Sequence, residues 1–92
     1  SSADALALSI SDDHWQVRKF SLRALNAHVL ENHISNILPL LCDDYSDVRK
    51  EAALALGGIS TDQSRAALKR SINDSDIEVR IASEKSLALI GN

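Results

Sequence analysis

Residues 43–57 read Asp-Asp-Tyr-Ser-Asp-Val-Arg-Lys-Glu-Ala-Ala-Leu-Ala-Leu-Gly, and versions of this stretch occur three times in the 92-residue chain. Displacing the sequence by 31 residues, without a gap, aligns four residue types in triplicate: Asp12, Asp43 and Asp74; Val17, Val48 and Val79; Arg18, Arg49 and Arg80; Leu25, Leu56 and Leu87. Self-similarity at such a period is the signature of stacked supersecondary units. The chain therefore predicts a repeat architecture with units 1–30, 31–61 and 62–92.

Each unit is predicted to be a pair of helices around a turn. In the second helix of the middle unit, apolar or small residues recur with the helical period of 3.6, at Val48, Ala52, Ala55, Leu56 and Ile59. The first helices carry apolar pairs four residues apart: Leu6 and Ile10, Ile37 and Leu41, Leu68 and Ile72. The predicted fold is all-α: a single domain forming an α-solenoid of three helical hairpins, with about six helices.

Local signals add three expectations. Clusters of Asp, Ser and Asn between the helices are predicted to form turns and cap the helices that follow. Pro39 should shorten or bend the first helix of unit two, because proline removes a backbone hydrogen bond. Gly57, Gly58 and Gly91 lie near predicted helix ends, where a positive φ is often required.

Composition narrows the classes of function. The chain has 10 Lys and Arg against 13 Asp and Glu, which argues against nucleic acid as a partner. No apolar run approaches the roughly 20 residues of a membrane helix, so no membrane partner is predicted. The single cysteine, Cys42, cannot form an internal disulfide and indicates a reducing compartment, the cytoplasm. The lack of methionine predicts that the chain is a fragment of a longer solenoid.

The pattern Asp-x4-Val-Arg-x5-Ala-Leu-Gly, met in full by Asp43, Val48, Arg49, Ala55, Leu56 and Gly57, resembles the HEAT repeat. More narrowly, it is similar to the HEAT-like repeats of the phycobilin-lyase type, and the resemblance extends over the whole chain. Units one and three depart from the pattern with Asn26 and Ala88 in place of glycine, and with Ser at sites usually held by Ala.

The resemblance implies a polar ladder between adjacent units, formed by the repeated Asp and the Arg six residues later. The matching pairs are Asp12 and Arg18, Asp43 and Arg49, and Asp74 and Arg80. The physical reason is that a turn Asp can cap a helix while it accepts charge-assisted hydrogen bonds from a partly buried guanidinium. These six residues are therefore predicted to be structural.

No group of residues predicts catalysis, a cofactor or a metal site. His28 and His33 are five residues apart across a predicted helix end, and no Asp, Glu or Cys lies at a spacing that would support zinc there. His14 is expected in a solvated turn, and His28, in the register of Ile59 and Ile90, is expected to be packed. Cys42 is expected to be a buried thiol, and the adjacent Asp43 and Asp44 disfavour a reactive thiolate.

The remaining candidate is the face of the second helices opposite the apolar stripe, which the resemblance places on the concave side. It comprises the positions two, five, six and nine residues after each repeated Val: Lys19, Leu22, Arg23, Asn26, Lys50, Ala53, Leu54, Gly57, Ile81, Glu84, Lys85 and Ala88. Four bases against one acid predict a positive face with exposed Leu22, Leu54 and Ile81. The predicted function is a non-enzymatic scaffold that binds a protein through Lys19, Leu22, Arg23, Lys50, Leu54, Ile81 and Lys85.

Three alternatives stay open. The same face is equally well explained as a solvated surface with scattered apolar residues. The resemblance also implies a component of a bilin lyase or a related chromophore-handling protein. A nucleic-acid binder would need a denser basic groove with aromatic side chains for stacking.

Finally, the terminal units lack polar caps, as in the run Leu87–Ile90, which predicts uncovered apolar ends and self-association or further repeats.

Overall fold

A computed structural model describes residues 9–25 and 27–91 of the chain. The elements are the 3-10 helix η1 (Ser9–Ser11), α2 (Trp15–Ala24), α3 (Ala27–Glu31), α4 (Ile34–Ile37), the 3-10 helix η2 (Leu38–Cys42), α5 (Ser46–Leu56), α6 (Asp62–Ser71) and α7 (Ile77–Ile90). The described part of the chain contains helices and no strand, as the all-α prediction requires. Leu6, Asn26 and Asn92 lie outside the described residues.

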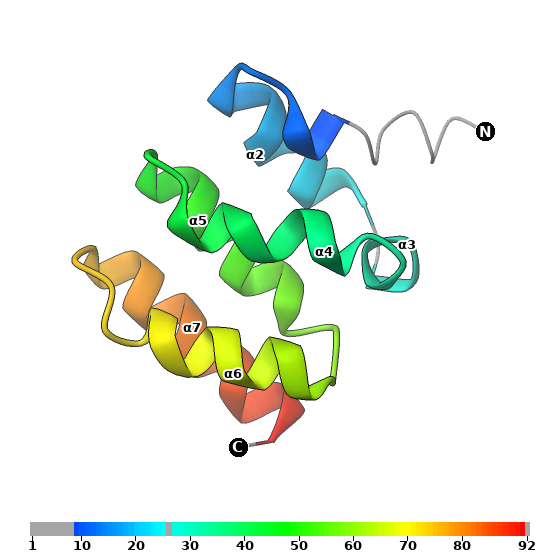
Figure 1. The fold of residues 1–92 in the computed structure, drawn as a ribbon. Helices are drawn as coiled ribbons and strands as arrows, with labels where there is room; N and C mark the ends of the chain where they lie inside the picture. The colour runs from blue at the N-terminus through cyan, green and yellow to red at the C-terminus, as the bar shows by residue number, and fades with distance from the viewer. Residues whose placement is uncertain (1–8, 26, 92) are drawn as a thin grey trace.

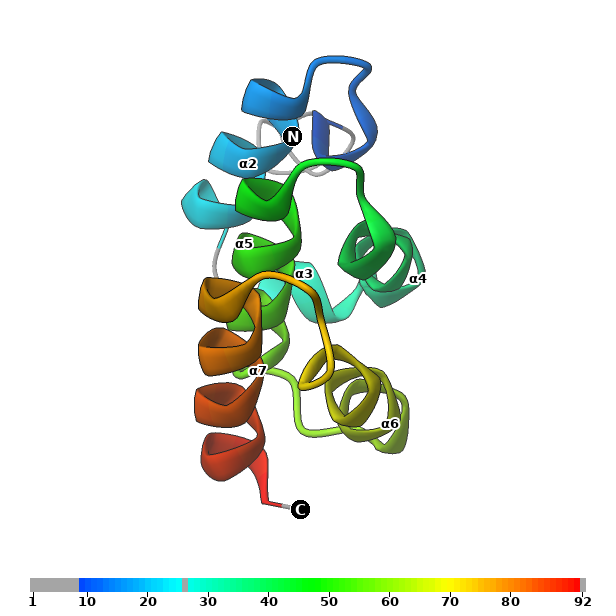
Figure 2. The same ribbon diagram turned by 90° about the vertical axis from the view of Figure 1, so that its left-hand side faces the viewer.

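The helices form two layers. Figures 1 and 2 show α2, α5 and α7 side by side in one layer, with η1, α4 and α6 in the other. α2 packs against α5, α5 packs against α7, and α6 packs against α7. The second helices of the three units therefore follow one another along the stack, and the predicted α-solenoid is confirmed.

The core lies between the layers and between successive units. Val48, Ala52 and Leu56 of α5 and Ile59, which follows the helix, are at most 1% exposed, and Ala55 is partly buried. The predicted apolar stripe is therefore the buried side of this segment. From the other layer Ile37 and Leu68 are fully buried. Apolar burial stabilises by about 25 cal/mol per Å², and here each unit supplies part of its neighbour's core.

Buried serines explain the departures from the alanine pattern. Ser83 Oγ donates to the carbonyl of Val79 at 2.8 Å, and Ser86 Oγ donates to the carbonyl of Ala53 in the preceding unit at 2.7 Å. Among the described residues no buried side-chain polar atom lacks a partner. Serine is therefore tolerated in the core because a backbone carbonyl satisfies each hydroxyl.

Proline interrupts the first helix of unit two as predicted. α4 has only four residues and passes into η2, in which Pro39 occupies one of the first two positions. Leu40 and Leu41 take the buried side of η2, and Cys42 is exposed. The prediction of a buried thiol at Cys42 was wrong, because a 3-10 helix turns faster than the α-helix that the pattern assumed.

Unit one departs from the repeat after its second helix. α2 ends at Ala24 and Leu25 is extended, with φ −89° and ψ 138°. The register that aligned His28 with Ile59 therefore does not continue, and the short helix α3 buries Leu30 (2% exposed) instead. His28 is exposed, so its predicted packing was wrong.

The two ends of the stack differ. Val17 is 37% and Phe20 62% exposed on α2, whereas Val48 and Val79, at the positions equivalent to Val17, are fully buried. The reason is that α2 is the first of the described second helices and has no earlier one against it. On α7 the position that corresponds to buried Leu22 and Ala53 holds an exposed charge, Glu84.

A stacked aromatic pair joins units one and two. The rings of Trp15 and Tyr45 lie 4.8 Å apart between centroids with an interplanar angle of 16°. Trp15 begins α2 and Tyr45 immediately precedes α5, so the pair bridges the same ends of two neighbouring helices.

Candidate functional site

Arg18 connects the turn of its own unit with the turn of the next. Its Nη1 donates to the backbone carbonyl of Asp12 at 2.7 Å, while Nε and Nη2 donate to the two carboxylate oxygens of Asp43 at 2.8 and 3.1 Å. The Asp43 side chain is 7% exposed. Two parallel hydrogen bonds between a guanidinium and a carboxylate combine strength with a fixed geometry.

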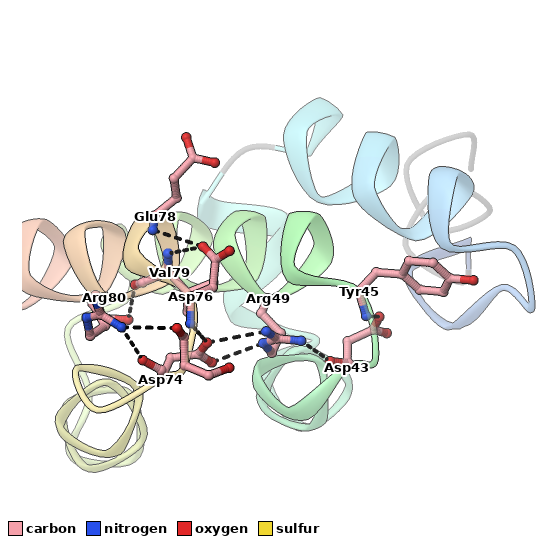
Figure 3. Close-up of polar contacts among 10 residues, drawn as sticks. Asp43, Tyr45, Arg49, Asp74, Asp76, Glu78, Val79 and Arg80 are labelled. Carbon is pink, nitrogen blue, oxygen red and sulfur yellow. Dashed lines mark hydrogen bonds and ion pairs between the residues drawn. The ribbon is translucent and has the colours of Figure 1, made fainter.

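Arg49 repeats this arrangement one unit later, as Figure 3 shows. Its Nη1 donates to the carbonyl of Asp43 at 2.7 Å, and Nε and Nη2 donate to the carboxylate of Asp74 at 3.0 and 3.3 Å. Each carboxylate also closes its own turn: Asp43 accepts from the N–H of Tyr45, and Asp74 accepts from the N–H of Asp76. We call this series of Asp and Arg residues the polar ladder.

The ladder ends differently at Arg80 and Asp12. Arg80 donates from Nη1 to the carbonyls of Asp74 and Ser75 and has no carboxylate acceptor among the described residues. Asp12 accepts from the N–H of His14 at 2.8 Å, and that hydrogen bond is the main reason that the pKa of Asp12 lies below its ordinary value. His14 itself is largely exposed, as predicted.

Four of the six predicted ladder residues join adjacent units, and the geometry differs from the predicted pairs. Within one unit the Arg binds the backbone carbonyl of its Asp, and the carboxylate binds the Arg of the preceding unit. The ladder therefore holds neighbouring units in register, and its guanidinium groups are occupied by the protein itself.

The predicted binding face is only partly open. Leu54 (39%), Ile81 (52%), Arg23 and Lys85 are exposed. Leu22 is buried, so its predicted exposure was wrong, and Ala53 at the equivalent position of α5 is buried as well. They lie about 60° around the helix from Lys19 and Lys50, on the flank that faces the next unit. We call the remaining residues the second-helix strip: Lys19, Arg23, Lys50, Leu54, Ile81 and Lys85.

The family model described as HEAT repeats matches residues 3–88, which is most of the chain. The chain belongs to the HEAT-repeat family. No curated protein shows a significant match to it. The match is to HEAT repeats as a class, so the phycobilin-lyase type and the handling of bilins, which the narrower resemblance implied, stay predictions.

The strip of this HEAT-repeat chain is not the positive surface that the sequence predicted. Lys19 pairs with Asp47 at 3.4 Å, Arg23 with Glu51 at 3.9 Å, and Lys50 with Glu78 at 3.6 Å. Each acid comes from the helix of the following unit. Lys85 alone among the cations of the strip forms no ion pair with the described residues.

Two hollows flank Leu54 on the strip. Hollow one lies between α2 and α5 and is lined by Leu22, Arg23, Leu25, Leu30, Glu51, Leu54, Ala55 and Gly58. Hollow two lies between α5 and α7 and is lined by Lys50, Leu54, Glu78, Ile81, Ala82 and Lys85. Aliphatic side chains and charged side chains, which we call the rims, line both hollows, a combination typical of protein-binding surfaces.

Other chemistry is sparse in the described part of the chain. No group of three or more His, Cys, Asp or Glu residues there could hold a metal ion. His33 precedes α4, and His14 Nδ1 lies 3.3 Å from Asp12 Oδ1 in an exposed turn. Between residues 9 and 91, position 26 aside, no helix has the length and apolar character needed to cross a membrane.

Proposed function

We propose that this HEAT-repeat chain is a non-enzymatic scaffold that binds a partner protein through the second-helix strip. The observation that carries the proposal is the pair of exposed aliphatic side chains, Leu54 and Ile81, which both line hollow two. They project from α5 and α7, whose mutual packing fixes their positions. Stacked helical repeats commonly present extended surfaces of this kind to other proteins.

The paired charges around the strip support specificity more than affinity. Surface ion pairs contribute about 0–1 kcal/mol each, so Lys19, Arg23 and Lys50 offer little attraction while Asp47, Glu51 and Glu78 lie beside them. The aliphatic residues supply the binding free energy in this proposal, and the charges define which partners fit. The proposal places the protein in the cytoplasm, where a lone exposed thiol such as Cys42 stays reduced.

Replacing both Leu54 and Ile81 with serine tests the proposal. Because both side chains are exposed, the double variant should keep its helical circular dichroism while it loses the partner. The measurement is affinity capture from an extract of the source cells on the immobilised protein, with mass spectrometry and then calorimetry on the protein retained. A variant with Ile77→Ser and Leu89→Ser is the matched control, since these residues are 60% and 76% exposed on α7 and line neither hollow.

The control variant should retain the same partner as the unmodified chain. A partner that binds the Leu54 and Ile81 variant as tightly as the unmodified chain would show that binding occurs elsewhere.

A further inference from the structure

The two hollows are spaced by one helix of the stack. Hollow one lies between α2 and α5, hollow two lies between α5 and α7, and Leu54 of α5 contributes to both. Packed helices in proteins have axes about 8–10 Å apart, so the centres of the hollows are separated by roughly 10 Å. A segment that fills both must therefore place two side chains on one of its faces at that distance.

An α-helix meets this requirement. Side chains seven residues apart lie on nearly the same face and about 10.5 Å apart along the axis. In a β-strand, residues on one face are about 6.6 Å apart when two positions separate them and about 13 Å apart when four do. Neither spacing matches the required distance. A polyproline helix repeats every 9 Å or so, but it is recognised by aromatic grooves, and the described lining of both hollows is aliphatic and polar.

The charges on the two rims favour a partner segment with an acidic side chain at one end of the site. The rim of hollow one holds Arg23 and Glu51, which pair with each other. The rim of hollow two holds Lys50, Glu78 and Lys85, of which Lys50 and Glu78 pair at 3.6 Å. Lys85 is the unbalanced cation, so an acidic group of the partner is favoured beside hollow two.

We propose that the strip binds an amphipathic helix with two aliphatic side chains seven residues apart and an acidic side chain within one turn of the second. The first aliphatic side chain enters hollow one, the second enters hollow two, and the acid faces Lys85. This inference rests on the proposed function and specifies the partner's chemistry.

Fluorescence anisotropy with labelled helical peptides tests the inference. The matched peptide has about 18 residues, long enough to be helical in water, with leucines seven residues apart and a glutamate one turn before the second. A peptide of the same composition with the leucines five residues apart presents them on different faces. The matched peptide should bind at least about tenfold more tightly, because the other buries only one leucine.

Variants of the protein test each contact. Leu54→Ser should weaken the matched peptide about tenfold or more, because Leu54 borders both hollows, and Leu89→Ser should leave its affinity unchanged. Lys85→Glu should weaken the matched peptide, and a peptide with lysine in place of the glutamate should recover affinity for that variant.

The outcomes separate the inference from the proposed function. No binding of the matched peptide at about 1 mM would overturn the inference. Equal affinity for both leucine spacings would also overturn it, yet the strip would stand as a docking surface if Leu54→Ser weakened both peptides. The proposed function fails separately, when the captured partner binds equally well to the Leu54 and Ile81 variant.

Discussion

Replacing Arg49 with alanine is expected to lower the free energy of unfolding by about 3 kcal/mol. Arg49 makes two hydrogen bonds to Asp74 of unit three and one to the carbonyl of Asp43 in its own unit, and the side chains of Arg49 and Asp74 are 15% and 11% exposed. Without the guanidinium, the Asp74 carboxylate stays largely buried and loses its cation. Removal of one partner from such a pair costs more than the pair contributes, because the remaining charge is left unsatisfied.

Arg80→Ala is the matched control for this prediction. Arg80 holds the same place in its unit but donates only to backbone carbonyls among the described residues, so a loss of about 1 kcal/mol is expected. Arg49→Lys should fall between the two, since an ammonium cannot make the paired hydrogen bonds of a guanidinium. Urea unfolding followed by circular dichroism measures all three, and equal losses for the two alanine variants would contradict a stabilising role of the cross-unit carboxylate.

Gly57→Ala is expected to destabilise the protein by about 2 kcal/mol, although alanine is the better helix former. A Cβ atom at Gly57 would lie 2.6 Å from Ser86 Oγ and 3.1 Å from Ser86 Cβ. The serine cannot easily turn away, because its hydroxyl donates to the carbonyl of Ala53 at 2.7 Å. Gly57 has a φ of −65°, so the glycine is needed for the close approach of α5 and α7 and not for a left-handed backbone.

A double-mutant cycle with Ser86→Ala measures this close contact. Ser86→Ala alone should cost about 1 kcal/mol through the lost hydrogen bond. In the double variant the nearest clash is gone, so its loss should be smaller than the sum of the two single losses. If Gly57→Ala instead raised the free energy of unfolding, α5 and α7 could not be in close contact between Gly57 and Ser86.

The repeat offset predicted the architecture because equivalent positions meet equivalent neighbours. Val48 and Val79 are both fully buried, and the residues 31 positions apart lie on the same side of α5 and α7. The offset did not predict burial correctly where equivalent positions have different neighbours. Among the described residues no earlier second helix lies beside Val17. α2 ends at Ala24, one residue earlier than α5 relative to the repeat, and the extended Leu25 takes the chain out of register before His28.

Glycine is required at Gly91 and at Gly57 for two different physical reasons. Gly91 ends α7 with a φ of 84°, as the sequence predicted for a glycine at a helix end. Gly57 was assigned the same need, but contact with the next helix decides its identity. The sequence shows that glycine stands at both positions. It does not show whether the backbone conformation or contact with a neighbouring residue requires glycine there.

The candidate site was harder to predict than the fold because its charges pair across units. The three ion pairs of the strip all join residues 28 apart: Lys19 with Asp47, Arg23 with Glu51, and Lys50 with Glu78. The contacts between Arg and Asp carboxylates in the ladder join residues 25 apart. Counting charges on each helix alone misses such pairs, whereas a search for opposite charges at one fixed separation would have found them.

The stacking of Trp15 on Tyr45 gives the molecule a local optical reporter. The chain has one tryptophan and one tyrosine, so its intrinsic emission senses the junction between the first two hairpins alone. Circular dichroism averages over every helix. Where the two signals change together on heating, the stack opens as one body, and where emission changes first, the stack separates at its amino-terminal junction while the later hairpins remain joined.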